Sequence, residues 1–394
     1  MENSILIFGG GDLQISIIKK AKTLGYKTIV LDPNSNAPGK NYCDKFYDIA
    51  GDDYERTLEV AKFHKVVGVV TAATDHPILM MCRIAEALNL PFPTFNSCET
   101  LLNKGKFKDF LRDNNINHAK GSVYNFDEII DKNAINFPVI LKPIKNSGSR
   151  GVLKCEKKEN FERDITECKS FCSKGPFIIE EFISGDEISV EAFVINNKVQ
   201  IVQITDKIIT SPPYNVELGH IQPSKYDGKR EGIENILQKI VDKLDLNNCV
   251  LHPEIKIDNG KLIIIEIGPR LGGDNITSLL VPLSTGIDME ALQINISTGK
   301  KIDLNFLHNH SLISFLDFLE DKKVIDEISF EQLNNFFPEI VEFRCSLKKG
   351  DIIKPITNSL NRYGYFVISN EYRLDLLKKE KAIKDYLSNK ILSS

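Results

Sequence analysis

The sequence predicts an α/β and α+β protein, in which an N-terminal doubly wound parallel-sheet domain precedes a part built mainly on antiparallel strands. Two observations carry this prediction. Apolar, strand-like runs alternate with helical stretches over residues 4–90, which is the pattern of parallel βαβ units. Beyond residue 137, strand-like runs follow one another across short turns, and the Asp-Asn-Gly turn at 258–260 is typical of an antiparallel hairpin.

The N-terminal domain is predicted from buried strands separated by helices. The strands are expected at 4–8, 27–32 and 66–73, and the helices at 12–25, 53–64 and 77–90. The first strand ends in Gly9, Gly10 and Gly11, which do not satisfy the G-x-G-x-x-G pattern of dinucleotide sites. A lone glycine turn is weak evidence, so a nicotinamide enzyme is disfavoured, although Asp32 stands where a carboxylate could hold a ribose.

Changes of pattern divide the chain into several expected parts. An N-terminal α/β domain at 1–95 is followed by linker helices and a small lobe at 96–185, a large lobe at 186–310 and a C-terminal lobe at 311–394. Within the second part, one helix is expected at 98–115. Within the third part, the segment 211–224 is expected to be irregular rather than plain sheet.

The composition is that of a globular protein without a nucleic-acid surface or a membrane span. The 394 residues are 42% hydrophobic and 26% charged, and the net charge is −4 without a long run of Lys or Arg. No apolar run approaches the ~18 residues of a membrane span, and the first residues lack the pattern of a signal peptide. Eight cysteines are scattered without a CxxC pair, which favours reduced thiols over a zinc site. We therefore expect a cytoplasmic protein with no nucleic-acid or membrane partner.

Two glutamates in the expected hairpin point to a metal site. Glu254 and Glu266 lie on its two strands, evenly spaced from the turn, so their side chains can face the same side of the sheet. Two neighbouring carboxylates repel and raise each other's pKa unless a cation lies between them. Mg²⁺ prefers one or two such carboxylates together with substrate phosphates. The alternative is a pair of exposed strand carboxylates without a ligand.

Lysines and a glycine-serine loop elsewhere in the chain are suited to phosphate. Lys104 precedes the small lobe, and Lys142 ends a strand just before the loop 146–151. Backbone amides of such a loop can wrap a phosphate, and a lysine supplies a point charge for its oxygens. The loop is not a Walker A motif, because no G-K-[ST] follows it. The run 180–183 offers backbone groups at a strand edge that could read a flat base.

An ordered set of motifs resembles the ATP-grasp superfamily. It consists of Lys104, the strand FPVILKP with Lys142, the loop NSGSRG, the run EEFISGDE, Glu254 and the run IEIGPRLGGD. The order is most similar to that of the carboxylate–amine ligases related to biotin carboxylase, the carbamoyl-phosphate synthetase large chain and the L-amino acid ligases. The resemblance covers nearly the whole chain, and residues 347–370 are similar to the biotin carboxylase C-terminal lobe. It implies a two-lobed ATP-grasp fold between the N-terminal domain and a small C-terminal lobe, with ATP and Mg²⁺ as cofactors.

The resemblance also implies a role for each residue of these motifs. The expected ATP-binding residues are Lys104 and Lys142 on the α- and β-phosphates, Gly148, Ser149 and Gly151 in a loop that closes over the γ-phosphate, Glu180, Glu181 and Ile183 at the adenine, and Glu187 at the ribose. The resemblance assigns Mg²⁺ to Glu254 and Glu266, and catalytic roles to Lys142 and Arg270, with Arg270 facing an acyl phosphate. The chain departs from the family at Gly268, where an Asn two residues after the second Glu is common, and this puts the full metal shell in doubt.

The activity that the resemblance implies is that of an acid–amine ligase, which forms a C–N bond. Such enzymes use ATP to phosphorylate a carboxylate, and an amine then attacks the acyl phosphate to give an amide, ADP and phosphate. We expect an amino acid or a similar small metabolite as substrate, with His220 and Asp75 as substrate contacts, and a homodimer as the assembly. The alternatives are a bicarbonate-dependent carboxylating ligase of the purine or biotin type and a nucleotide-binding protein without turnover.

Overall fold

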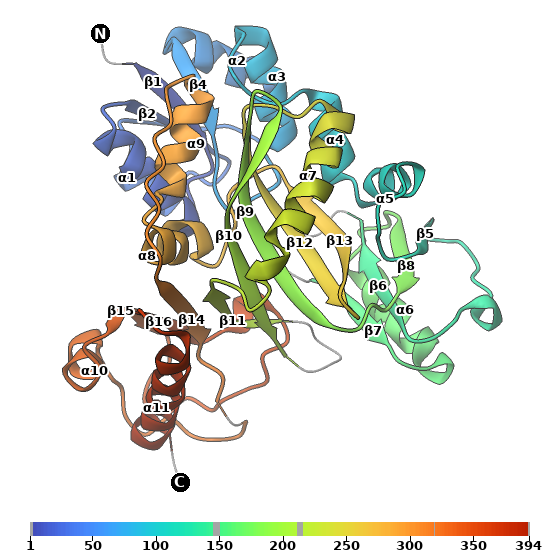
Figure 1. Ribbon diagram of the computed structural model, residues 1–394, viewed down its shortest axis with the longest axis vertical. Helices are drawn as coiled ribbons and strands as arrows, with labels where there is room; N and C mark the ends of the chain where they lie inside the picture. Colours follow the sequence, from blue (N-terminus) through green and yellow to red (C-terminus); the bar gives the residue numbers. More distant parts are fainter. Residues whose placement is uncertain (1–2, 145–149, 211–215, 319, 393–394) are drawn as a thin grey trace.

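The computed structural model describes residues 3–144, 150–210, 216–318 and 320–392. Its strands form two four-stranded sheets and one eight-stranded sheet. Figure 1 shows the long strands of the largest sheet in the middle of the molecule, between the N-terminal domain, the small lobe and the C-terminal part. The predicted combination of a parallel-sheet domain with lobes built on antiparallel strands is confirmed.

The N-terminal domain has a parallel sheet in the order β3-β2-β1-β4. Its strands are β1 (Ser4–Phe8), β2 (Lys27–Asp32), β3 (Lys45–Asp48) and β4 (Val66–Val70), and its helices are α1 (Ile15–Thr23), α2 (Tyr54–Phe63) and α3 (Ile78–Leu88). The sequence pattern does not predict β3, because its residues Lys-Phe-Tyr-Asp are exposed or half-buried and form no apolar run. The glycine turn after β1 is held from β2, since the backbone N–H of Gly10 donates to Asp32 Oδ2 at 2.7 Å.

The small lobe carries an antiparallel sheet in the order β5-β8-β6-β7. Its elements are the linker helices α4 (Phe95–Leu102) and α5 (Lys104–Asp113), then β5 (Gly121–Tyr124), β6 (Val139–Pro143), β7 (Leu153–Cys155), α6 (Phe161–Ser170) and β8 (Phe177–Glu181). The expectation of one helix at 98–115 is wrong, because Asn103 leaves the helical conformation. Its side chain then accepts from the backbone N–H groups of Gly105 and Lys106, and this cap starts α5 with Lys104 at its first position.

The large sheet has the order β13-β12-β9-β10-β11-β14-β16-β15. Its strands are β9 (Asp186–Ile195), β10 (Lys198–Ile209), β11 (Glu217–Gln222), β12 (Cys249–Asp258), β13 (Lys261–Gly268), β14 (His310–Phe315), β15 (Ile340–Cys345) and β16 (Gly364–Asn370). The C-terminal strands β14, β16 and β15 thus extend the sheet of the large lobe. The expectation of irregular chain at 211–224 is wrong for β11, because its backbone pairs with strands on both sides; residues 211–215 lie outside the described residues.

Helices cover this sheet and join it to its neighbours. They are α7 (Arg230–Leu244), the π-helix Ile276–Leu280, α8 (Val281–Thr285), α9 (Met289–Ser297), α10 (Phe330–Phe336) and α11 (Arg373–Ile391). Helix α9 packs on the N-terminal domain against α1 and β4 (Figure 1). Gly68 permits this approach, since a Cβ there would lie 2.8 Å from the carbonyl oxygen of Ser297. Within the described residues, no helix is both long and apolar enough to cross a membrane.

Candidate active site

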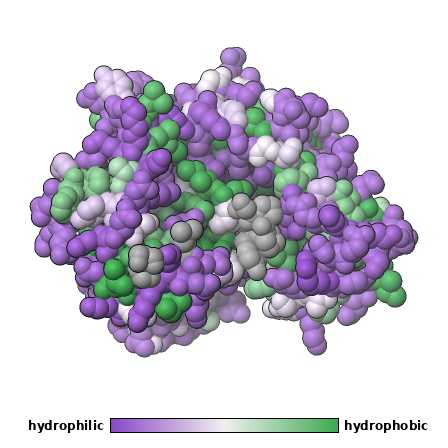
Figure 2. Space-filling model, turned by 90° about the horizontal axis from the view of Figure 1, so that it is seen from below, coloured by the Kyte–Doolittle hydropathy of each residue, from purple (hydrophilic) through white to green (hydrophobic). Residues whose placement is uncertain are grey.

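A cleft of about 580 Å³ opens where the N-terminal domain, the small lobe, the large sheet and the C-terminal part meet. Figure 2, seen from below, shows a hollow between two lobes with hydrophobic surface inside it and hydrophilic residues around it. The cleft brings together most of the residues singled out from the sequence, namely Asp75, Lys104, Lys142, Glu180, Glu181, Ile183, Glu187, His220, Glu254, Glu266 and Arg270. Gly148 and Ser149 lie outside the described residues. Gly151 has a φ of +76° and packs on Phe171, where a Cβ would come within 2.8 Å of that side chain.

Glu254 and Glu266 face each other across the hairpin of β12 and β13. They are direct partners in the strand register, as the sequence predicts, and both line the cleft. Burial raises the pKa of Glu254, but the Lys207 ammonium at 3.1 Å and the His252 ring outweigh burial and hold that pKa well below its usual value. Glu254 is therefore ionised, and Glu266 lies 3.5 Å from the ammonium of Lys104.

The donor set of this pair suits Mg²⁺ bound together with phosphate. Both groups are hard carboxylate oxygens that open into the cleft. Across the described parts of the chain, no group of three or more His, Cys, Asp or Glu side chains is arranged to hold a metal by itself. A cation between Glu254 and Glu266 would thus need further oxygens from a bound substrate, which is the usual pattern for Mg²⁺.

Lys207 on β10 is a cleft residue that the sequence reading missed. Its side chain is only 4% exposed, and its ammonium lies 2.5 Å from Glu187, 3.1 Å from Glu254 and 3.5 Å from Glu217. Burial lowers the pKa of Lys207, but these carboxylates raise it well above its usual value, so the side chain stays charged. The available signal was a lysine inside the apolar run IVQITDKII. A buried charge of this kind needs partners, and here it ties Glu187 to Glu254.

Lys142 is fixed by a buried carboxylate that bridges two lysines. Glu180 on β8 lies 2.5 Å from the Lys142 ammonium through Oε1 and 2.7 Å from the Lys108 ammonium through Oε2. Burial lowers the pKa of Lys142, but the attraction of Glu180 outweighs it and the pKa is raised. Lys108 was missed from the sequence, although it follows Lys104 by four positions and shares its face of α5. The side chain of Glu180 therefore positions Lys142.

The strand edge expected to read the adenine is already part of the hydrogen-bond network. The backbone N–H of Glu181 donates to the carbonyl of Lys120 at 2.8 Å, and the N–H of Phe182 donates to that of Pro138 at 3.2 Å. The Glu181 carboxylate accepts from the Lys120 N–H at 2.8 Å. Ile183 follows this edge and lines the cleft.

Arg270 reaches from the loop after β13 to the N-terminal domain. Its Nε donates to Asp75 Oδ1 at 2.7 Å and its Nη2 to Asp75 Oδ2 at 3.4 Å. Asp75, expected as a substrate contact, therefore has Arg270 as its partner in this structure. Gly268 leaves room for the guanidinium, since a Cβ there would lie 3.2 Å from Arg270 Cζ. The departure from the family pattern at Gly268 thus has a local steric consequence.

His220 belongs to a second charged cluster in the lining of the cleft. Asp274 accepts from Arg362 Nη2 at 2.6 Å and from Nη1 at 2.8 Å, and His220 Nε2 lies 3.3 Å from it. Burial raises the pKa of Asp274, but Arg362 and His220 hold it far below its usual value. Arg362 comes from the C-terminal part and stacks on Phe315 with 3.7 Å between its Cζ and the ring centroid. No local pattern around Arg362 indicated its role, because only the fold brings it to Asp274.

A third buried contact lies beside the carboxylate pair. His252 Nδ1 is 2.6 Å from Oε1 of the fully buried Glu191, and His252 Nε2 is 3.8 Å from Glu254 Oε1. Gly272 lies against this pair, since a Cβ there would come 2.7 Å from His252 Nδ1. His252 therefore links Glu254 to the interior of the sheet.

Two known protein families match separate stretches of this chain. Residues 135–278 match the ATP-grasp domain family, and residues 2–97 match the ribonucleotide synthetase preATP-grasp domain family. The arginine-specific large chain of carbamoyl phosphate synthase from Bacillus subtilis is 23% identical over 297 residues, which is 73% of this chain. The chain spans only 28% of the length of that relative.

Two further proteins match over nearly the full length. The formate-dependent phosphoribosylglycinamide formyltransferase of Wolinella succinogenes is 23% identical over 386 residues, which cover 96% of this chain and 95% of the relative. The crystal structure of an L-amino acid ligase from Bacillus licheniformis superposes with a TM-score of 0.81 at 19% identity, over 98% of this chain and 97% of that chain. This last likeness concerns the fold. The matches to both domain families, over residues 2–97 and 135–278, show that the chain belongs to the ATP-grasp superfamily, whose ligases use ATP with Mg²⁺.

Proposed function

We propose that this protein is an ATP-dependent carboxylate–amine ligase, which forms an amide bond through an acyl phosphate and releases ADP and phosphate. Its substrates are a small carboxylate and a small amine, at least one of them an amino acid or a similar metabolite. The observation that carries the proposal is the convergence of Lys104, Lys142, the Glu254–Glu266 pair and Arg270 on one cleft. Phosphoryl transfer depends mainly on positioning and charge stabilisation, and these side chains supply both.

In this proposal, different side chains of the cleft bind different parts of the nucleotide. Lys104 and Lys142 bind the α- and β-phosphates, with Lys142 oriented by Glu180. Glu180, Glu181 and Ile183 line the adenine end, and Glu187 meets the ribose. Gly148, Ser149 and Gly151 belong to the loop over the γ-phosphate. Glu254 and Glu266 would hold Mg²⁺, which neutralises phosphate charge when it is bound.

Chemistry in this proposal proceeds in two balanced steps. A carboxylate oxygen of the substrate attacks the γ-phosphorus of ATP, and ADP leaves. The amine then attacks the acyl carbon, phosphate leaves, and the nitrogen loses a proton to give the amide. Arg270 stabilises the charge on the transferred group, because its planar guanidinium matches phosphate and carboxylate oxygens.

The substrates occupy the end of the cleft opposite the nucleotide. We assign to that end Asp75 and Arg270 together with His220, Asp274 and Arg362, all of which line the cleft. We propose that Asp75 acts on the substrate through its ion pair with Arg270, and that His220 acts on it through its contact with Asp274. The partners of the protein are accordingly small molecules, in a cytoplasmic protein that is expected to form a homodimer.

The test is a phosphate-release screen of amino acids and related acids, singly and in pairs, followed by mass spectrometry of the products. ADP formation that needs two substrates, with an amide product, supports the ligase. ADP formation that needs bicarbonate and one amine favours the carboxylating alternative. AMP and pyrophosphate as products overturn the acyl-phosphate route. Binding of MgADP without turnover under any pair identifies a nucleotide-binding protein instead. Lys142→Ala serves as the inactive control.

A further inference from the structure

A second cavity, of about 1120 Å³, lies apart from the cleft and shares none of its lining residues. We name it the strap groove, because residues 300–309, the strap, form one of its walls. The other walls come from β9 and β10 between Phe193 and Gln203, from the end of α8, and from the start of α7. The strap is fixed to α8, since the N–H groups of Leu307 and Asn309 donate to the carbonyls of Thr285 and Ser284.

Side chains around the strap groove suit an anion with an apolar body. Phe193, Val202, Ile302 and Leu304 give it apolar surface. Its charged lining comprises Lys198, Lys300, Lys301 and Arg230, against Asp227, Glu234 and Glu371. Arg230 and Asp227 neutralise each other at 2.8 Å, which leaves three lysines against two glutamates. The two histidines of the groove, His308 and His310, add no negative charge. A volume of this size accommodates a small metabolite.

A buried chain of hydrogen bonds runs from the strap groove toward the cleft. Gln203 Nε2 donates to Ser284 Oγ at 3.0 Å, Ser284 Oγ donates to Gln222 Oε1 at 2.8 Å, and Gln222 Nε2 donates to Thr205 Oγ1 at 2.9 Å. Gln203 and Ser284 line the groove. Thr205 and Lys207 lie two positions apart on β10, so they share a face of the strand. Lys207 in turn contacts Glu254 in the cleft.

A change at one end of this chain can be transmitted to the other end, because the polar groups of all its members are buried and hydrogen-bonded. A buried amide or hydroxyl that loses its partner carries the full cost of its desolvation, so the members shift together rather than one at a time. A ligand that takes a hydrogen bond from Gln203 or Ser284 would change the partner left for Gln222, and through it the position of Thr205.

We propose that the strap groove is an effector site for a small organic anion with an apolar body, and that its occupancy is coupled to the nucleotide end of the cleft through Gln203, Ser284, Gln222 and Thr205. The proposal goes beyond the ligase reaction, and testing it needs no turnover.

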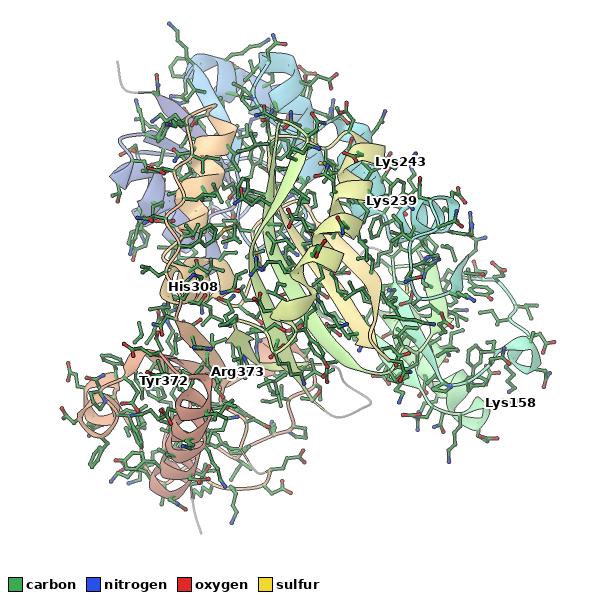
Figure 3. All side chains as sticks on the ribbon, in the orientation of Figure 1. Lys158, Lys239, Lys243, His308, Tyr372 and Arg373 are labelled. Atoms are coloured by element: carbon green, nitrogen blue, oxygen red, sulfur yellow. The ribbon has the colours of Figure 1, made fainter. Side chains whose placement is uncertain are left out.

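The probe is anilinonaphthalene sulfonate, an aromatic anion that fluoresces when it enters an apolar pocket. It is titrated into the full chain with and without saturating MgADP. We expect one saturable site that persists with MgADP, with a dissociation constant that changes at least about threefold. The double variant Lys198→Glu/Lys301→Glu should weaken the probe at least about tenfold. Lys243→Glu is the matched control, because this exposed lysine on α7 lies well apart from His308 of the strap in Figure 3. It should change the affinity less than about twofold.

Coupling is tested separately with Thr205→Val, which keeps the shape of the side chain and removes the acceptor for Gln222. Probe binding should survive, while the shift caused by MgADP should disappear. The site is overturned if MgADP abolishes probe binding, if no saturable binding occurs, or if the double variant binds like the wild type. The coupling is overturned if MgADP leaves the affinity unchanged or if Thr205→Val keeps the shift. Thermal melting of each variant checks that it is folded.

Discussion

Arg270 holds Asp75 across the boundary between the large lobe and the N-terminal domain, with Nε 2.7 Å from Oδ1 and Nη2 3.4 Å from Oδ2. The arginine side chain is 12% exposed and the aspartate 32%. A planar guanidinium bound through two nitrogens has little freedom to turn, so Asp75 sets the direction in which the remaining N–H groups of Arg270 point. The N-terminal domain thus contributes to the orientation of a residue that the ATP-grasp fold supplies.

Asp75→Asn should lower kcat by about 10-fold to 10²-fold and change the KM for ATP little, because loss of orientation acts on the step that Arg270 assists. Steady-state kinetics with ATP and each substrate varied in turn measure the effect. If Asp75 instead binds the substrate ammonium directly, the KM of that substrate should rise while kcat holds. Thr74→Ser, next to it in the same cleft, is the control and should leave both constants near wild type.

Lys142→Ala should reduce turnover by about 10²-fold to 10³-fold, because it removes a preorganised charge at the phosphates.

Lys108→Met tests the positioning role of Glu180, whose second oxygen would lose its partner at 2.7 Å. We expect a smaller loss, of about 10-fold, with a raised KM for ATP. Lys108→Arg should restore part of it. Full activity of Lys108→Met would show that Glu180 holds Lys142 without help.

The sequence predicts the helices and strands of this fold better than it predicts which side chains meet in the tertiary structure. The strands β1, β2 and β4 and the hairpin of Glu254 and Glu266 follow from apolar runs and an Asp-Asn-Gly turn, which are local signals. Local patterns of this kind did not predict the contacts made by Lys207, Lys108 and Arg362. Each matters because a carboxylate from another element lies beside it, and only the tertiary structure brings Glu187, Glu180 and Asp274 there.

The prediction of the lobes from the sequence is limited in the same way, because the sheet to which a strand belongs depends on tertiary contacts. A break between β8 and β9 follows from the Ser-Gly turn near Gly185, and the two strands belong to different sheets. The strands β14, β15 and β16 read as a separate lobe, yet they continue the large sheet through β11. The sequence of a short strand does not show which sheet edge the strand will pair with. Pairing at an edge uses the backbone N–H and C=O groups, which every strand has, rather than a side-chain pattern.

Glu290→Gln should remove a pH dependence of stability that comes from a residue outside the lining of the cleft. Burial raises the pKa of Glu290 on α9 to about 7, from 4.5, against the opposing hydrogen bond from Ser16. The folded protein therefore holds this proton more tightly than the unfolded chain does. Its contribution to the free energy of unfolding is fully present below pH 4.5 and is lost as the pH rises through about 7.

At about pH 8 the variant should be more stable than the wild type by up to about 3 kcal/mol, because a neutral amide replaces a buried carboxylate. Near pH 4 the two proteins should unfold alike. Urea unfolding at both pH values measures the difference. Glu59→Gln, an exposed position on α2, is the control and should show no such pattern. A variant that is less stable than the wild type at pH 8 would mean that the charged form of Glu290 is stabilising.

Glu266→Gln addresses the metal site most directly. The change keeps the shape of the side chain and removes one of the two facing charges that a cation would neutralise. Turnover should fall steeply, and the Mg²⁺ concentration needed for half-maximal rate should rise by about 10-fold or more. Stability without metal should change by less than about 1 kcal/mol, because the half-exposed contact with Lys104 contributes little and its loss is offset by relief of the repulsion from Glu254.

Two companion variants separate metal binding from other roles of the cleft charges. Glu217→Gln removes a cleft carboxylate that contacts Lys207 at 3.5 Å and faces no second carboxylate in the hairpin, so its Mg²⁺ requirement should match the wild type. Arg270→Lys should leave ATP affinity nearly unchanged but lower kcat, since an ammonium cannot reproduce the two-nitrogen contact with Asp75 or match a planar group. If Glu266→Gln keeps normal turnover and the normal Mg²⁺ dependence, Glu266 holds no metal, and the carboxylate pair is only the end of a hairpin. If Glu217→Gln shifts the Mg²⁺ requirement equally, the effect comes from the general charge of the cleft rather than from a ligand.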